Sequence, residues 1–338
     1  KQIRKAGPII SNSTLPRFKN VILHLANNHF MDLGFRNALD NTSVFKKKRI
    51  KYVGFGKSLY DSRKELILNI KNKKIAIIGC CEPQFGVSNI DRGGVAEVGP
   101  WVIDKIIKLK KQCDYIIVSI HGGLETSPWP MPETRDLYRS WINAGASLVQ
   151  GHHSHIPQAW EKFNKGYIFY GLGNFCVDPE NWKDHKNNLW SIGIEIFFKK
   201  KMVVKVKNYE IKKTNKFISV IPAKNNQRYK KYFNIVNSNF KNNENLENIW
   251  NELSIQLFNF FGKKYMQWTL SPIKTQAKNI LKSILKREIK PNYIYYYHML
   301  SLDSHRIMLK NATSILCGEK NYRSLKKIKK LIKNYCYF

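Results

Sequence analysis

The chain has 338 residues, 43% of them hydrophobic, so it can bury the core of one sizeable α/β domain and a smaller appendage. No uninterrupted apolar run reaches the roughly 18 residues that span a bilayer. The formal net charge of +34 is spread along the chain and comes mostly from lysine, as on a solvated basic surface. It accompanies none of the aromatic and basic motifs of known RNA-binding modules, which makes nucleic acid an unlikely partner. An anionic polymer or anionic lipid surface is the alternative to simple solvation.

The six cysteines favour a reducing compartment, because they show neither a C-x-x-C pair nor the spacing of a disulfide scaffold. The chain opens at Lys1 without an initiator methionine, so we expect that an N-terminal piece is missing. The expected location is therefore cytoplasmic or membrane-associated, and extracytoplasmic if an anchor precedes Lys1.

Between about residues 21 and 220, short β-branched runs alternate with amphipathic helices, which is typical of an α/β domain. In chain order, the expected elements are a strand at 21–25, a helix at 34–45, a hairpin of 65–70 with 75–81, a helix at 101–111, a strand at 115–120, a helix at 133–143, strands at 147–150 and 167–172, and a hairpin of 190–198 with 202–206. After about Pro222, Asn- and Lys-rich sequence precedes apolar residues at helical spacing. These patterns predict one domain over 1–222 and a basic α-helical region over 223–338.

Three short polar segments, 26–29, 121–123 and 151–155, each follow a predicted strand. In α/β sheets, the loops at the carboxyl ends of strands converge on one rim, where ligands bind. Neutral imidazole and amide groups delivered there suit a Zn, Mn or Fe ion better than Ca or Mg. The segments therefore predict a metal site, with bystander histidines as the alternative.

The histidines of these segments differ in what they can do. His153 and His155 are two residues apart, so on an extended segment both point the same way and can serve one metal or two neighbouring metals. His152 should alternate away, and we expect it at most to orient a neighbour. His121 follows an apolar strand and precedes two glycines, which allow the backbone to approach a ligand closely. Taken alone, His121 would be read as a histidine at the edge of the core.

Asn28 and His29 follow the first predicted strand. An Asn carbonyl oxygen can ligate a cation, and an adjacent histidine can donate a proton to a leaving oxygen. Asp32 lies three residues beyond His29 and can hold its imidazole protonated. The alternative is a helix N-terminus at which Asn and Asp act as caps.

Four segments resemble motifs of the CapA-type capsule or poly-γ-glutamate biosynthesis family, in the order and spacing of that family. Residues 25–34 resemble A-N-N-H-x-x-D-x-G, and residues 121–125 look like H-W-G-x-E, with Gly122 where Trp is usual. Residues 144–155 are similar to A-G-A-D-x-V-x-G-H-H-P-H, with Ser147 and Ser154 as departures, and residues 169–175 resemble F-Y-S-L-G-N-F.

This family belongs to the calcineurin-like metallophosphatase superfamily, so the resemblance implies an α/β fold, a four-layer αββα sandwich with two metals. It implies that the divalent ions, one or two of Mn, Zn or Fe, are held by Asn28, His121, His153 and His155. His29 would be the proton donor, with Asp32 as its partner. Glu125 and Asn174 would line the substrate side. Arg63 follows the G-x-G of the family's second strand and faces either the site or the solvent.

The earliest motifs of the superfamily, a Gly-Asp strand and in this family an Asn-Leu-Glu segment, lie upstream of the Asn-Asn-His motif. The first twenty residues contain neither Asp nor Glu. We therefore expect that the N-terminus of this metallophosphatase-like domain is incomplete or that its metal site is depleted. In both cases we expect the chain to bind at most one metal tightly and to have little phosphoesterase activity.

The resemblance implies a protein of capsule or polyanionic polymer (poly-γ-glutamate-like) biosynthesis that hydrolyses phosphoester or related bonds with a metal. Its partners would be an anionic polymer or phosphoester substrate and capsule-synthesis membrane proteins. The alternative is a non-catalytic accessory protein that binds anionic polymer or membrane partners of a capsule-synthesis complex. The retained His29 favours the enzyme, whereas the missing carboxylates favour the accessory protein.

Overall fold

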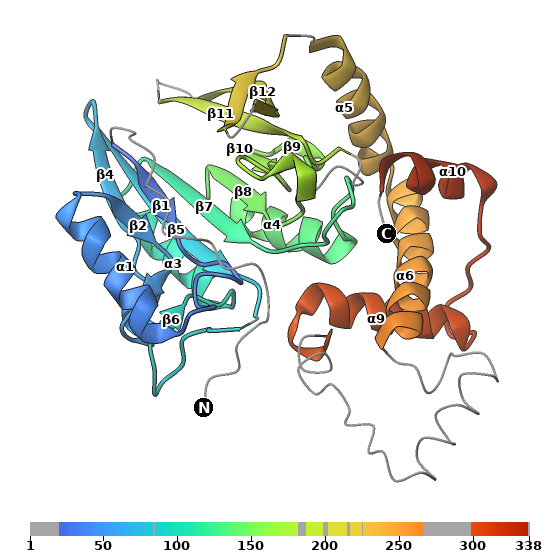
Figure 1. Cartoon of the computed structure of the whole chain (residues 1–338), viewed down its shortest axis with the longest axis horizontal. Coiled ribbons are helices and arrows are strands. Elements are labelled where there is room, and N and C mark those ends of the chain that lie inside the picture. Colours follow the sequence, from blue (N-terminus) through green and yellow to red (C-terminus); the bar gives the residue numbers. More distant parts are fainter. Residues whose placement is uncertain are drawn as a thin grey trace. The chain divides into compact units, whose positions relative to one another are not determined.

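The computed structural model describes residues 20–83, 85–181, 187–198, 202–214, 217–224, 226–265 and 299–336. The chain divides into two compact units, Lys1–Lys241 and Asn242–Phe338 (Figure 1).

The first unit is built on a six-stranded sheet in the order β4-β5-β7-β8-β10-β9. The four inner strands run parallel, and the two outer strands are antiparallel to their neighbours. Ile78, Val118 and Val149 on the inner strands are fully buried, as expected for a parallel sheet covered on both faces. The strands are β4 (Leu66–Ile70), β5 (Lys73–Cys81), β7 (Tyr115–His121), β8 (Leu148–His152), β9 (Trp160–Phe163) and β10 (Gly166–Phe169).

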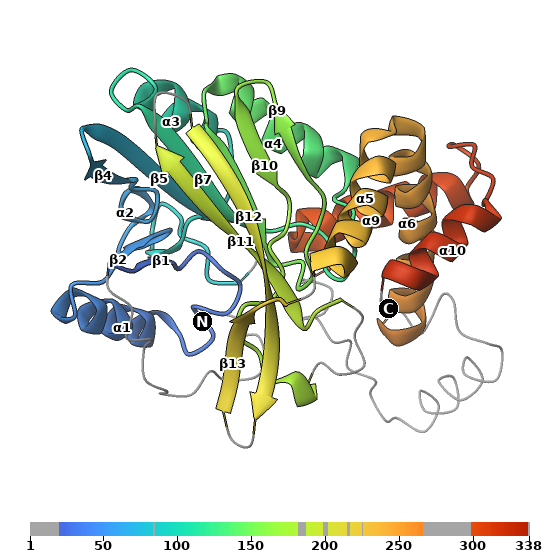
Figure 2. The ribbon, with the colours of Figure 1, turned by 90° about the horizontal axis from the view of Figure 1, so that it is seen from above.

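Helices α3 (Trp101–Leu109) and α4 (Pro132–Ala144) cover one face of this sheet (Figure 2). Each helix buries one apolar stripe. Val102 and Ile106 lie on the buried stripe of α3, and Tyr138 and Trp141 lie on that of α4. Tyr138 stacks against Tyr170, just beyond β10, with ring centroids 5.5 Å apart.

The parallel pair β1 (Ile22–His24) and β2 (Lys51–Val53) lies on the other face, with α1 (Phe35–Lys47) outside it. The two β-layers touch at Gly79, where an added Cβ would lie 2.6 Å from a methyl carbon of Val53. Figure 2 shows α3, the large sheet, the β1–β2 pair and α1 in succession. This is the αββα order expected from the sequence.

Two further groups of elements belong to the described part of the first unit. The short strands β3 (Phe55–Gly56) and β6 (Gly94–Val95) pair beside the one-turn helix α2 (Leu59–Ser62). β11 (Trp190–Phe198), β12 (Met202–Thr214) and β13 (Phe217–Pro222) form an antiparallel sheet, preceded by the 3₁₀ turn Pro179–Asn181.

Helix α5 (Asn226–Lys241) packs on this first unit. The hydroxyl of Tyr232 donates to the carbonyl of Pro157 at 2.6 Å, and the Trp129 indole donates to the carbonyl of Val236 at 3.1 Å. The compact units consequently divide after Lys241. The boundary at residue 222 concerns where the family domain ends, and it stays a prediction.

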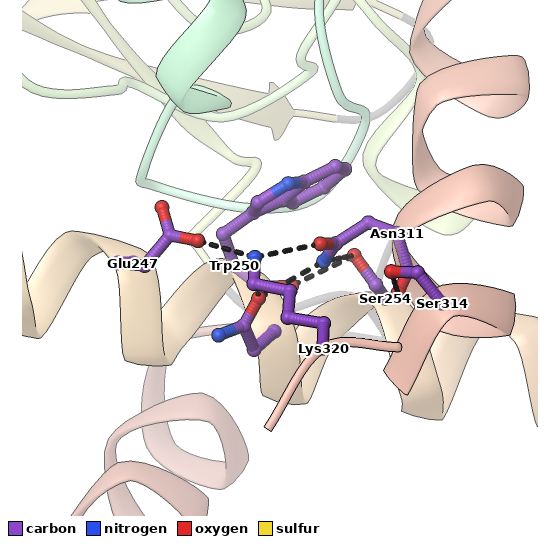
Figure 3. Close-up of polar contacts among 7 residues, drawn as sticks. Glu247, Trp250, Ser254, Asn311, Ser314 and Lys320 are labelled. Carbon is purple, nitrogen blue, oxygen red and sulfur yellow. Dashed lines mark hydrogen bonds and ion pairs between the residues drawn. The ribbon is translucent and has the colours of Figure 1, made fainter. Parts of the chain in front are cut away.

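The described residues of the second unit form the helices α6 (Asn243–Tyr265), α9 (Asp303–Leu316) and α10 (Lys326–Tyr335). A polar cluster joins α6 and α9 to the segment between α9 and α10 (Figure 3). The ammonium of Lys320 donates to the side-chain oxygens of Asn251 at 2.8 Å and Asn311 at 2.9 Å, and it pairs with Glu247. Over the described residues the region after Pro222 is mainly helical, and none of the described helices is long and apolar enough to cross a membrane.

Candidate functional site

The loop after β1 is shaped by Asn27 and delivers Asn28 into the interior. The side-chain oxygen of Asn27 accepts the backbone N–H groups of His29 at 2.9 Å and Phe30 at 2.8 Å, which turns the chain sharply. Asn28 is only 4% exposed, and its side-chain oxygen lies 3.0 Å from Nε2 of His121 at the end of β7. Two segments that are far apart in the sequence therefore meet through side chains, as the strand ends predicted.

His121 begins a chain of hydrogen bonds across the ends of β7 and β8. Its Nδ1 lies 2.8 Å from Nδ1 of His152, whose Nε2 lies 3.4 Å from the hydroxyl of Ser119. Gln150 donates to the same hydroxyl at 3.3 Å. If His121 donates to the Asn28 oxygen through Nε2, its Nδ1 must accept, and His152 must carry the shared proton. The tautomers of the two histidines are therefore coupled.

These histidines are held neutral. Burial, reinforced by His153 and His152, lowers the pKa of His121 well below its usual value, and burial with His24 and His153 does the same for the pKa of His152. His24 of β1 meets the His152 ring edge-on at 4.4 Å between centroids, and burial lowers its pKa to about 4. A metal binds the neutral form of imidazole, so these side chains need no deprotonation at neutral pH before coordination.

His153 and His155 lie on the loop after β8 in strained backbone conformations. Their φ angles are +116° and +60°, in the region that residues other than glycine seldom adopt. The His153 ring lies 4.6 Å from that of His121 and 6.2 Å from that of His155, measured between centroids. The structure thus brings Asn28, His121, His153 and His155 together as a continuous group.

Glu125 and Asn174 also adjoin this group. A carboxylate oxygen of Glu125 lies 3.3 Å from Nε2 of His153, and half of the Glu125 side chain is exposed. The side-chain oxygen of Asn174 accepts from Nδ1 of His155 at 2.9 Å, and its amide donates to the carbonyl of Asn188 at 3.1 Å. Glu125 is thus at the open side of the group, whereas Asn174 is buried and orients His155.

His29 and Asp32 form a pair beside the buried group. Nδ1 of His29 lies 2.7 Å from one carboxylate oxygen of Asp32, and the other oxygen of Asp32 is buried without a hydrogen-bond partner. The side chain of Asp32 is 11% exposed and that of His29 is 36% exposed. His29 therefore keeps Nε2 available on an accessible ring while Asp32 holds it from behind.

Arg63 is placed differently. Its guanidinium lies over the Trp101 ring, 5.2 Å from the centroid, and its Nε is buried without a hydrogen-bond partner. None of the hydrogen bonds or ring contacts found within the described ranges joins Arg63 to the histidines. Its assignment to the substrate side stays a prediction.

The side-chain atoms of this group are of the types that bind a divalent metal ion, although they do not surround a common point. Across the described residues, no three side chains of His, Cys, Asp or Glu are clustered closely enough to hold an ion as they stand. Asn28 Oδ1 and His121 Nε2 nevertheless face each other at 3.0 Å. Two ligands bound at about 2.1 Å and at right angles lie about 3 Å apart, so this pair can share one ion once the hydrogen bond between them is replaced. The mixture of imidazole and amide oxygen suits Mn, Zn or Fe.

Sequence reasoning missed two residues that adjoin the group, His24 and Glu82. His24 lies within the β1 strand, and its only signal was alternation, which aims it at the same face as the other histidines. Glu82 follows β5, is 7% exposed, and accepts the backbone N–H of Gly123 at 2.7 Å. It belongs to none of the four motifs, so only strand pairing shows that it lies beside the His121 loop.

Comparisons with known proteins show the family of the chain. Residues 11–179 match the family described as bacterial capsule synthesis protein PGA_cap. The chain belongs to this family. The CapA-type resemblance expected from the motifs is thus confirmed.

Three relatives share the matched region. The capsule biosynthesis protein CapA of Bacillus anthracis is 30% identical over 174 residues, which are 49% of this chain and 42% of that protein. The PGA biosynthesis protein CapA of Bacillus subtilis (strain 168) is 34% identical over 166 residues, 48% of this chain and 43% of that protein. A probable polyglutamine synthesis accessory protein of Mycobacterium tuberculosis is 27% identical over 177 residues, 48% of this chain and 47% of that protein. The chain spans less than half the length of each of these relatives.

Two solved structures share features of the backbone at low similarity. A putative 5'-nucleotidase from Staphylococcus aureus is 13% identical with a TM-score of 0.39, covering 62% of this chain and 41% of that chain. A 5'-nucleotidase from Candida albicans is 14% identical with a TM-score of 0.35, covering 71% of this chain and 43% of that chain.

Proposed function

We propose that this chain acts in the synthesis of a capsule or poly-γ-glutamate-like polymer as a metal-dependent hydrolase of phosphoester or related bonds. The proposal rests on the meeting of Asn28 and His121 at 3.0 Å, continued by His153 and His155, with the accessible His29–Asp32 pair beside them. The names of the relatives supply the capsule and polymer context, whereas the chemistry is inferred from the side chains.

Asn28, His121, His153 and His155 would hold the ion. When bound, a divalent ion supplies Lewis-acid activation of water and of the ester oxygen. His29 donates a proton from Nε2 to the leaving oxygen, because Nδ1 is engaged with Asp32. Asp32 fixes the orientation of the His29 ring through its contact with Nδ1. Asn174 orients His155, and Glu125 borders the open side of the site, where the substrate enters.

The four donors are neutral, so they compensate the charge of one divalent ion poorly and the charge of two divalent ions even less well. We therefore expect metal analysis of the purified chain to find at most one tightly bound ion. The functional test compares hydrolysis of bis(p-nitrophenyl) phosphate and of poly-γ-glutamate with Mn²⁺ or Zn²⁺ added. Wild type should hydrolyse one of them slowly and in a metal-dependent manner.

Two variants separate the roles in this test. His121→Gln should lose both metal and hydrolysis. His29→Gln should keep the metal and lose about 10²- to 10⁴-fold in kcat, the usual contribution of a positioned general acid. Metal binding without hydrolysis of any such ester or polymer by the wild-type chain would instead support the accessory role, and absence of metal binding would refute the proposed site.

A further inference from the structure

The loop after β7 carries a glycine where the family motif usually has tryptophan. A Cβ added at Gly122 would lie 2.7 Å from Cγ and 3.1 Å from Cδ of Glu82. The first distance is shorter than the contacts that Cβ atoms make in proteins, the second is tighter than most of them, and both atoms belong to a buried side chain. Glu82 therefore occupies the space that a side chain at position 122 would need.

Glu82 also binds the backbone on both sides of Gly122. Its own N–H donates to the carbonyl of His121 at 2.9 Å, and its carboxylate accepts the N–H of Gly123 at 2.7 Å. Gly123 has a φ of +101°, a conformation that this carboxylate contact helps to hold. One residue at the end of β5 thus sets the path of the chain as it leaves β7.

The opposite side of the same loop is joined to the segment that carries His153. The N–H of Gly122 donates to the carbonyl of His152, and the N–H of Thr126 donates to the carbonyl of Ser154, both at 2.9 Å. Between these two bonds, Glu125 reaches His153 at 3.3 Å. The position of the loop consequently sets the distance between His121, Glu125 and His153.

We propose that Glu82 is a positioning residue of the site and that Glu82 and Gly122 are a matched pair. Glu82 acts through the loop backbone, because its carboxylate is bonded to the N–H of Gly123. Successive side chains of a strand point to opposite faces, so the Glu82 side chain, which fills the space of a Cβ at Gly122, lies on the face of β7 opposite to the His121 ring. The effect of Glu82 on metal binding rests on the proposed function, whereas the pairing of Glu82 with Gly122 does not.

The first test titrates the chain with Mn²⁺ alone. Glu82→Ala should weaken Mn²⁺ binding about 10- to 100-fold, as loss of a residue that orients a metal ligand does. Glu82→Gln keeps an acceptor oxygen for Gly123 and should retain most of the affinity. Glu161→Ala is the matched control, because Glu161 is equally buried at 8% exposure and bonds to Arg139 and Tyr170 in the same sheet. It should lower stability and leave Mn²⁺ affinity unchanged.

The second test uses metal-free protein and amide hydrogen exchange. The Thr126 amide is not bonded to Glu82, so its protection reports the position of the loop. Glu82→Ala should speed exchange at both Gly123 and Thr126, whereas Glu161→Ala should leave both unchanged relative to global stability. Unchanged protection at Thr126 in Glu82→Ala would overturn the positioning role, whether or not Mn²⁺ binds.

The third test is a double-mutant cycle on the melting temperature of the metal-free chain. Gly122→Ala should lower Tm in wild type and cost clearly less in Glu82→Ala, where the methyl group finds room. Fully additive effects would refute the matched pair. Failure of wild type to bind Mn²⁺ would overturn the proposed function alone, since the exchange and melting results decide the role of Glu82 without a metal.

Discussion

The contact of Asp32 with His29 is the one that orients the proposed proton donor. Asp32 Oδ2 lies 2.7 Å from Nδ1 of His29. None of the hydrogen bonds found among the described residues joins Asp32 to the four proposed metal donors. Asp32→Asn should leave metal content unchanged and lower kcat about 10- to 100-fold, by analogy with other residues that orient a catalytic or ligating histidine. Steady-state kinetics on a phosphodiester with parallel metal analysis would check this. An equal loss of metal and activity would mean that Asp32 is a ligand rather than the partner of His29.

His152 offers a second prediction at the same scale. For His121 to bind a metal through Nε2, its proton must be on Nδ1, which can then donate a hydrogen bond to His152 Nδ1, 2.8 Å away. His152→Phe removes that acceptor and should weaken Mn²⁺ or Zn²⁺ binding about 10- to 100-fold. His24→Phe is the control, because His24 meets His152 only by its ring edge. Equal affinities of the two variants in a metal titration would contradict the tautomer argument.

The segment between α9 and α10 is held against α6 by the polar cluster of the second unit (Figure 3). Asn251 and Ser254 are buried on α6, and Lys320 and Asn311 satisfy them from outside that helix. Glu252 is also buried and accepts the hydroxyls of Tyr322 at 3.0 Å and of Ser324. Because these polar groups are satisfied only while the segment is docked, the cluster binds the segment to α6.

Lys320→Met should therefore destabilise the second unit by about 1–3 kcal/mol, since it removes the charged donor from the oxygens of the buried Asn251 and the half-buried Asn311. Lys326→Met on the exposed face of α10 is the matched control and should change stability by less than about 0.5 kcal/mol. Urea denaturation followed by tryptophan fluorescence would measure both. Equal midpoints for the two variants would show that the cluster contributes nothing to stability.

At the scale of the whole molecule, the buried histidines make stability depend on pH. The pKa of His24 is about 4 in the folded chain, below its ordinary value of 6.5, and the pKa values of His121 and His152 are lowered as well. A lowered pKa means that the unfolded chain binds more protons, so stability is full above about pH 6.5 and is lost as the pH falls toward 4. Urea midpoints of the metal-free chain should decrease between about pH 7.5 and pH 5.

His24→Phe should flatten part of this dependence, because it removes one of the groups that takes up a proton on unfolding. The measurement stays above about pH 5, where the lowered carboxyl pKa values, such as that of Asp114 beside Lys73, add little. A midpoint that does not change over this pH range in wild type would show that the histidines are accessible to protons in the folded state.

The sequence by itself determined the elements that bear the site. The apolar runs at 75–81 and 115–120 predicted β5 and β7, and polar residues directly after each strand end predicted that Asn28, His121 and His153 would meet at one rim. Local pattern is enough for this, because side-chain alternation and the direction of parallel strands follow from backbone geometry alone. The motif spacing further identified the family.

The tertiary structure alone decided which side chains support those residues. Glu82, His24 and the hydrogen bond between His152 and His121 depend on strand pairing between segments far apart in the chain, and no local pattern encodes such pairing. Strand β9 was missed because Trp160–Phe163 is short and includes two charged residues, and only its neighbour β10 makes it a strand. The same holds for Gly122. The sequence shows only that a glycine stands where the family motif usually has tryptophan, and the contact with Glu82 explains why a glycine fits there.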